Sequence, residues 1–208
     1  MSDLERNWFL VAHSDHHLRD CREQFPLLPL EETLAIAEAL GIEHPTDPRT
    51  REPIVMTTDL VITVAEGLRE FDLARAIKPA GQLSLSRVLE KLELERRYWQ
   101  SRAVDWATLT DEGLPKTILR NMRWLFPCFD LPRFTNLAPA DIDRVRVEME
   151  PAILNGQLPL REITAACDSA LHLQPGTALL LARHFIASSQ WSVDLNTLID
   201  VRQPLRLR

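Results

Sequence analysis

The sequence predicts an α/β protein of two domains, with a mixed sheet flanked by helices in residues 1–110 and a mainly helical domain in residues 111–208. Two observations support this division. Two runs rich in β-branched residues lie between helical patterns in the first domain. In the second domain three helical patterns follow one another and end in a short alternating segment, which is the element order of a winged helix.

The first domain begins with two predicted helices separated by an extended segment. Residues 2–12 start with a serine that suits the N-cap, and Glu5 follows at the spacing of a capping box. Residues 19–28 are predicted to be extended. Residues 31–40 are predicted to be helical, because their apolar residues repeat at helical spacing and a glycine follows that suits the C-cap.

A β-hairpin is predicted next. Residues 54–64 (IVMTTDLVITV) are rich in Val, Ile and Thr, as strands are. Gly67 marks a turn, and residues 71–78 form a second run that stops before a proline.

The rest of the first domain and the link to the second carry three further elements. Residues 84–101 predict the clearest helix of the chain, with Ser84 as its N-cap. A short strand is expected in residues 103–109. Thr110 is then predicted to cap a helix in residues 111–125, which acts as a hinge or opens the second domain.

The second domain is predicted to be a winged-helix-like unit. Its three helices are expected in residues 139–154, 160–170 and 175–188. The alternating segment at residues 191–201 predicts a two-stranded ribbon. The third helix contains only Arg183 and His184 as basic-type side chains, whereas a helix that reads DNA bases carries more Arg, Lys, Asn or Gln. We therefore expect this domain to bind protein.

Composition excludes several classes of protein. Hydrophobic residues make up 45% of the 208 and charged residues 26%, which is typical of a folded globular chain. No segment reaches the ~18 consecutive apolar residues of a membrane helix, and the start has no secretory pattern. The three cysteines are odd in number and widely spaced, which predicts reduced thiols in a cytoplasmic protein. No membrane partner is predicted.

The negative charge is concentrated at the start of the chain. Residues 1–50 contain ten acidic and four basic residues, and residues 51–208 contain twenty of each. This is not the basic footprint of a typical nucleic-acid binder. A contact with DNA is therefore expected to be local, or to depend on a partner that supplies most of the phosphate contacts.

Asp59 and Lys78 are the first candidates for chemistry. Asp59 lies within the first strand of the predicted hairpin, and Lys78 ends the second. A carboxylate and a lysine on paired strands suit a metal-dependent nuclease, because Mg²⁺ prefers oxygen ligands and a nearby ammonium can offset charge on a phosphate. The same pattern also fits a structural aspartate and a solvated lysine, and spacing by itself favours that second interpretation.

The helix at residues 84–101 carries three further carboxylates. Glu90 and Glu93 are interpreted as surface residues, with Glu93 and Arg97 at the spacing of an ion pair. Glu95 lies near the apolar face of this helix, so an accessory carboxylate near a metal and a structural residue both remain open. A cluster of histidines is interpreted as a solvated loop (His13, His16 and His17).

Several motifs together resemble one known family. They are SDLER, REQFPLLP, MTTDLVI, AIKP and EKLELERRYW, and they occur in the order and near the spacing of the TnsA-type endonuclease subunit of heteromeric bacterial cut-and-paste transposases. The resemblance covers residues 2–112. The remaining chain resembles more loosely the C-terminal winged-helix-like domain of that family.

The resemblance implies a restriction-endonuclease-like catalytic domain. By motif position the catalytic residues are Glu5, Asp59 and Lys78. Glu5 and Asp59 are then expected to bind Mg²⁺, for which Mn²⁺ can substitute, and the Ile77 carbonyl is expected to complete the ligand set. Lys78 is expected to orient the attacking water or to stabilise charge on the phosphate.

Two features depart from the family pattern. The position two residues before the lysine, where restriction-type enzymes often have a carboxylate and this family often a glutamine, is Ala76. Only four residues precede Glu5, although family members usually carry an upstream segment, so either this lineage is short or an upstream portion is missing. We expect such a short start to weaken a ligand on the first helix.

The resemblance implies a Mg²⁺-dependent DNA endonuclease that cuts the non-transferred strands at the 5′ ends of a transposon. A TnsB-type DDE transposase is the expected partner for the 3′ ends, and a TnsC-type ATP-dependent regulator is expected to bind the C-terminal domain. The alternative is an adaptor that bridges these partners and has a lapsed active centre. A stand-alone nuclease is disfavoured by the acidic first quarter and the absence of a basic recognition helix.

Overall fold

The computed structural model describes residues 1–131 and 137–208, and its chain forms two compact units, Met1–Leu114 and Pro115–Arg208. The sequence predicts that the second domain begins at residue 111. Within the described residues, no helix is both long and apolar enough to cross a membrane.

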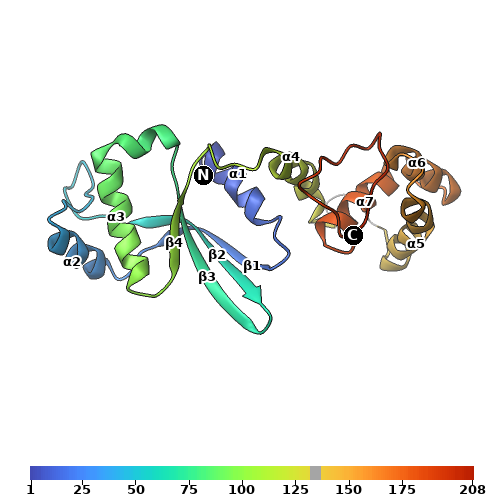
Figure 1. The fold of residues 1–208 in the computed structure, drawn as a ribbon. Helices are drawn as coiled ribbons and strands as arrows, with labels where there is room; N and C mark the ends of the chain where they lie inside the picture. The colour runs from blue at the N-terminus through green and yellow to red at the C-terminus, as the bar shows by residue number, and fades with distance from the viewer. Residues whose placement is uncertain (132–136) are drawn as a thin grey trace. The chain divides into compact units, whose positions relative to one another are not determined.

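A four-stranded sheet forms the centre of the first unit (Figure 1). Its strands, in spatial order, are β1 (Leu18–Pro26), β2 (Thr57–Glu66), β3 (Arg69–Ile77) and β4 (Asp105–Leu109). The first three strands run antiparallel to their neighbours, and β4 runs parallel to β3. The predicted hairpin and mixed sheet are therefore confirmed, although β2 begins at residue 57 rather than 54.

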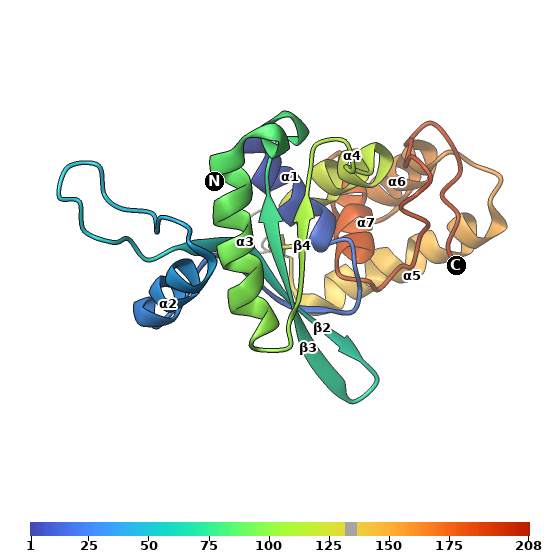
Figure 2. The same ribbon diagram turned by 60° about the vertical axis from the view of Figure 1, so that its left-hand side comes forward.

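Helices surround this sheet (Figure 2). They are α1 (Asp3–Ala12), α2 (Leu30–Leu40), the 3₁₀ helix η1 (Ala80–Ser84) and α3 (Ser86–Gln100). Because parallel strands need a crossover connection, η1 and α3 carry the chain from the end of β3 to the start of β4. Helix α1 packs against β1 and β2, and α3 packs against α2 and β4.

The ends of two helices differ from the prediction. Ser84 does not cap α3, since it ends η1 and its hydroxyl donates to the Gly81 carbonyl. The next helix, α4, begins at Lys116 rather than near residue 111, so Thr110 does not cap it. The Thr110 carbonyl instead accepts a hydrogen bond from the Trp8 indole of α1 at 3.1 Å.

Apolar side chains from the sheet, α2 and α3 form the core of the first unit. Leu27, Val61, Leu94 and Trp99 are all at most 4% exposed. The Tyr98 hydroxyl donates to the Leu28 carbonyl at 2.7 Å, which satisfies a polar group at the edge of this core. The connection from β1 to α2 is thereby fixed to α3.

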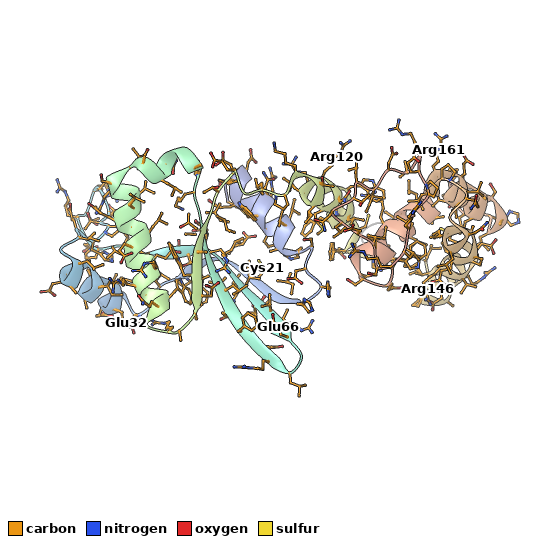
Figure 3. All side chains as sticks on the ribbon, viewed as in Figure 1. Cys21, Glu32, Glu66, Arg120, Arg146 and Arg161 are labelled. Carbon is orange, nitrogen blue, oxygen red and sulfur yellow. The ribbon has the colours of Figure 1, made fainter. Side chains whose placement is uncertain are left out.

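The second unit is helical. It contains α4 (Lys116–Leu125), the 3₁₀ helix η2 (Phe126–Cys128), α5 (Pro139–Asn155), α6 (Leu160–Ala170) and α7 (Thr177–Ala187). The last three lie close to their predicted ranges. Figure 3 labels three arginines of this unit, one on each of three helices, and Arg120 and Arg161 are exposed there. Phe185 and Leu181 of α7 are fully buried in its core.

The ribbon predicted at residues 191–201 is wrong, because no strand is present in residues 189–208. The side chain of Asn121, 1% exposed, binds this segment instead. Its amide nitrogen donates to the carbonyls of Leu195 and Thr197, and its oxygen accepts from the Ile199 N–H. Backbone groups that would form a ladder are thus taken by a side chain.

Candidate active site

Asp59 and Lys78 meet at the open end of the β2–β3 hairpin, opposite its turn. One carboxylate oxygen of Asp59, Oδ2, accepts from Lys78 Nζ at 2.8 Å and from the Ile77 N–H at 2.6 Å. Lys78 Nζ also donates to the Ile77 carbonyl at 3.0 Å. Asp59 is 8% exposed, so these hydrogen bonds offset the cost of burying its charge. Three residues predicted for the site therefore lie together.

Strand register explains why they meet. Leu60 pairs with Arg75 in the antiparallel β2–β3 ladder, which brings the residue before Leu60 next to the end of β3. The Lys78 N–H then donates to the Leu109 carbonyl of β4 at 3.0 Å. Strands β2 and β4 thus hold the end of β3, next to Lys78, from both sides.

A third strand contributes Gln24, which no pattern in the sequence singles out. Its amide nitrogen donates to Oδ1 of Asp59 at 3.2 Å, and its amide oxygen accepts from the Thr57 hydroxyl at 2.8 Å. Gln24 lies within the REQFP motif, but a glutamine in a strand gives no sign of its partner. The contact depends on the pairing of β1 with β2.

Glu95 forms a buried network beside Asp59. Its Oε1 accepts from the Thr58 hydroxyl at 2.8 Å and from the Trp106 indole at 3.1 Å. The Thr58 hydroxyl in turn accepts from the Trp99 indole at 2.7 Å. Burial, with a smaller effect of the nearby Asp59 charge, raises the pKa of Glu95 to about 7.

This network gives Glu95 a structural place in the first unit. Its carboxylate is hydrogen-bonded to Thr58 and Trp106, and no hydrogen bond among the described residues joins it to Asp59 or Lys78. The other two glutamates of α3 form surface ion pairs: Glu90 with Arg87, and Glu93 with both Arg96 and Arg97. The predicted pair between Glu93 and Arg97 is confirmed.

Glu5 lies on α1 and forms a capping box. Its carboxylate accepts from the backbone N–H of Ser2 at 3.1 Å and from the Ser2 hydroxyl at 2.9 Å. The Trp8 indole, one turn along α1, binds the Thr110 carbonyl and so ties this helix to the chain just after β4. The hydrogen bonds of the described residues therefore do not join Glu5 to Asp59, but α1 is anchored at the same end of β4 as Lys78.

The donor atoms around Lys78 suit a hard metal ion. The Asp59 carboxylate and the Ile77 carbonyl both direct an oxygen at one cation, the Lys78 ammonium. Oxygen donors of this kind are the ligands that Mg²⁺ prefers. Ala76, which is fully buried, adds no ligand. Asp59 and Ile77 therefore fit a metal ion, and a second carboxylate would have to come from another element, such as α1.

Two other groups are weaker candidates for a metal site or a nucleophile. Ligand atoms of Asp15, His16 and His17 lie within 4.8 Å of one another on an exposed turn, and Asp15 and His17 form an ion-pair contact at 3.2 Å. The sequence predicts that these histidines lie in a solvated loop. Burial, followed by the charge of Glu23, raises the pKa of Cys21 to about 11, which disfavours the thiolate that a nucleophile requires.

Comparison with known proteins identifies a family for this sequence. Residues 15–111 match the family model described as TnsA-like endonuclease N terminal, and residues 114–195 match the model described as TnsA endonuclease C terminal. Asp59, Lys78 and Gln24 lie within the first match, whereas Glu5 precedes it.

One curated relative is Transposon Tn7 transposition protein TnsA of Escherichia coli. It is 41% identical to this chain over 126 residues, which cover 61% of this chain and 45% of the relative. The chain thus spans about half the length of the curated relative it matches. The two family models together cover most of the sequence, in the same order as the two compact units. The chain belongs to the family of TnsA-like endonucleases.

Proposed function

We propose that this chain is a metal-dependent DNA endonuclease with Glu5, Asp59 and Lys78 at its catalytic centre. The observation that carries the proposal is the convergence of the Asp59 carboxylate and the Ile77 carbonyl on a single cation. The fit of residues 15–111 to the TnsA-like endonuclease model supports it independently.

Each residue of the site has its own proposed role in the reaction. A bound Mg²⁺ supplies an activated water and neutralises charge on the scissile phosphate. Asp59, the Ile77 carbonyl and Glu5 would hold the ion, although the Glu5 carboxylate is engaged by Ser2 in this structure. Lys78 would orient the water or offset charge on the phosphate. The buried network of Glu95 holds Thr58, and with it the adjacent Asp59, in place.

The proposed substrate is the end of a transposon. We infer that the chain cuts the non-transferred strands at the 5′ ends, while a TnsB-type DDE transposase cuts the 3′ ends. The similarity to a Tn7 transposition protein supports a role in transposition.

The second unit is proposed to bind a TnsC-type ATP-dependent regulator. Both basic-type side chains of α7 are engaged within the unit: the Arg183 guanidinium donates to the Trp124 carbonyl, and His184 Nδ1 lies 2.8 Å from the Cys128 carbonyl. A helix that reads DNA presents such groups to the bases. Their internal contacts therefore favour a protein partner over DNA for this helix.

Strand-specific cleavage of transposon-end DNA tests the proposal. The reaction contains Mg²⁺, the cognate partner transposase and either wild-type chain, Asp59→Asn or Lys78→Met. Both variants should lose 5′ nicks and keep the 3′ cuts made by the partner. Asp72→Asn is the matched control, because this aspartate lies on β3 and its carboxylate binds Arg22 and Thr63. Retention of 5′ nicking by Asp59→Asn contradicts the assignment.

An adaptor without nuclease activity is the second candidate. It is favoured by the capping box, which engages the Glu5 carboxylate, and by the absence of a polar side chain at Ala76. An adaptor would support 3′ cutting by the partner without making 5′ nicks. The same assay therefore separates the two functions, since wild-type chain nicks the 5′ ends only in the first.

A further inference from the structure

Gln24 lies beside Asp59 on the strand opposite Lys78. We propose that Gln24 is a positioning residue, which holds the Asp59 carboxylate in the orientation needed to bind a metal ion. Two contacts carry the proposal: Gln24 Nε2 donates to Asp59 Oδ1 at 3.2 Å, and Gln24 Oε1 accepts from the Thr57 hydroxyl at 2.8 Å. As a statement about metal binding, the inference rests on the proposed function.

The Thr57 hydroxyl and the Asp59 carboxylate together determine the direction of the Gln24 amide. A carboxylate only accepts hydrogen bonds, so it must face the NH₂ group of the amide. The opposite rotation would place the amide oxygen against the negative charge of Asp59. Since Thr57 donates to that oxygen, the observed orientation satisfies all three groups.

The two oxygens of Asp59 have separate partners. Oδ2 accepts from the Ile77 N–H and from Lys78 Nζ, whereas Oδ1 accepts only from Gln24 among the described residues. Hydrogen bonds to both oxygens prevent rotation of the carboxylate about χ2. Carboxylates that bind metals are commonly held in this way, and removing the supporting residue typically costs 10–100-fold in metal affinity or activity.

The backbone of Gln24 supports a specific role. Its φ is +48°, in the left-handed region that non-glycine residues rarely adopt, so this backbone conformation is strained. The strand remains paired on either side, through Glu23 with Leu60 and Phe25 with Thr58. A strained residue between two paired positions is maintained by its surroundings, and here its side chain is directed at Asp59.

The other neighbour of Asp59 cannot perform this task. Continuing the registers Leu60↔Arg75 and Glu23↔Leu60 by one residue places Asp59 between Ala76 on β3 and Gln24 on β1. Ala76 has no polar side chain. Gln24 is therefore the adjacent-strand side chain available to orient Oδ1.

Metal binding by the chain of residues 1–208 provides a readout that does not depend on cleavage. We would titrate Mn²⁺ and measure free ion by electron paramagnetic resonance, for wild type, Gln24→Met and Thr57→Val. Methionine keeps the approximate volume of glutamine but donates no hydrogen bond. Thr63→Val is the matched control, because it removes a hydroxyl on the same strand that donates to Asp72. Asp59→Asn measures the Mn²⁺ binding that remains when the proposed ligand itself is lost.

Gln24→Met should raise the Mn²⁺ dissociation constant about tenfold. Thr57→Val should raise it less, and Thr63→Val should leave it unchanged. In cleavage reactions with the partner transposase, saturating Mn²⁺ should restore the rate of Gln24→Met, because the ion compensates for a poorly oriented ligand. A merely structural defect would instead lower the melting temperature and persist at saturating metal.

The outcomes also separate this inference from the proposed function. If Asp59→Asn loses Mn²⁺ binding while Gln24→Met binds like wild type, the positioning role is wrong and the metal site stands. If Asp59→Asn binds Mn²⁺ like wild type, the proposed metal site is wrong. Loss of cleavage in Gln24→Met that saturating Mn²⁺ does not restore also overturns the positioning role.

Discussion

The ammonium of Lys78 lies 2.8 Å from the Asp59 carboxylate, and the same ammonium donates to the Ile77 carbonyl at 3.0 Å. A cation therefore already stands between the two oxygens proposed to bind metal. The Asp59 side chain is nearly buried and the Lys78 side chain only partly so, which makes Lys78 the more accessible member of the pair.

Removal of this ammonium should destabilise the metal-free protein. Lys78→Met leaves the buried Asp59 carboxylate with fewer donors, which should lower the free energy of unfolding by about 1–3 kcal/mol. Mg²⁺ should stabilise this variant more than wild type, because it meets no competing ammonium. Urea unfolding with and without Mg²⁺ measures both effects, with the exposed Lys91→Met as control. A variant that does not respond to Mg²⁺ would contradict a cation site at Asp59.

The two roles of Glu5 can be separated by substitution. Glu5→Gln should abolish 5′ nicking but leave the melting temperature unchanged, because glutamine also completes a capping box and is a weaker ligand for Mg²⁺. Ser2→Ala should do the reverse. It should lower stability by about 1 kcal/mol through loss of the N-cap and retain nicking. Normal nicking by Glu5→Gln would show that Glu5 is a capping residue only.

Glu95 should make stability depend on pH. Its pKa is raised from 4.5 to about 7, so the folded protein holds this proton more tightly than the unfolded chain. Stability is therefore lost as pH rises from about 4.5 to 7. Glu95→Gln removes this loss. Between pH 4.5 and pH 8, the free energy of unfolding of the variant should therefore rise by about 3 kcal/mol relative to that of wild type. Chemical unfolding at several pH values measures the difference.

Glu93, on the same helix, provides a control whose contribution to stability changes with pH in the opposite direction. Hydrogen bonding by Arg96, and then by Arg97, lowers the pKa of Glu93 to about 2. Its contribution to stability is present above pH 4.5 and is lost as pH falls toward 2. Glu93→Gln should therefore lower stability at neutral pH and converge with wild type in acid. Equal pH profiles for the Glu93 and Glu95 variants would contradict the burial of Glu95.

Asn121 should hold the C-terminal segment of the second unit. Asn121→Leu leaves two carbonyls and the Ile199 N–H without their side-chain partner, which should cost about 3 kcal/mol in unfolding free energy. Amide hydrogen exchange at Ile199 should accelerate at the same time. Asn155→Leu, on an exposed position at the end of α5, is the control and should change neither quantity.

Local patterns were sufficient for most elements. The capping box of Ser2 and Glu5, the left-handed Gly41 after α2 and the hairpin turn at Gly67 are encoded by a few adjacent residues, and the structure contains all three. Two of the failed predictions have different causes. Ser84 ends a short 3₁₀ helix, which is a local structure that competes with an N-cap, whereas the tail after α7 binds Asn121, a residue distant in sequence, rather than forming its own ribbon.

The sequence by itself determined the kinds of element, their order and the motifs that single out Asp59 and Lys78, because these depend on residues close together along the chain. Only the tertiary structure decided that Gln24 supports Asp59, that Glu95 is buried against Thr58, and that the tail forms no ribbon. Each of these depends on side chains from separate elements meeting at hydrogen-bonding distance. Strand register and packing set those distances, and local propensity carries no information about them.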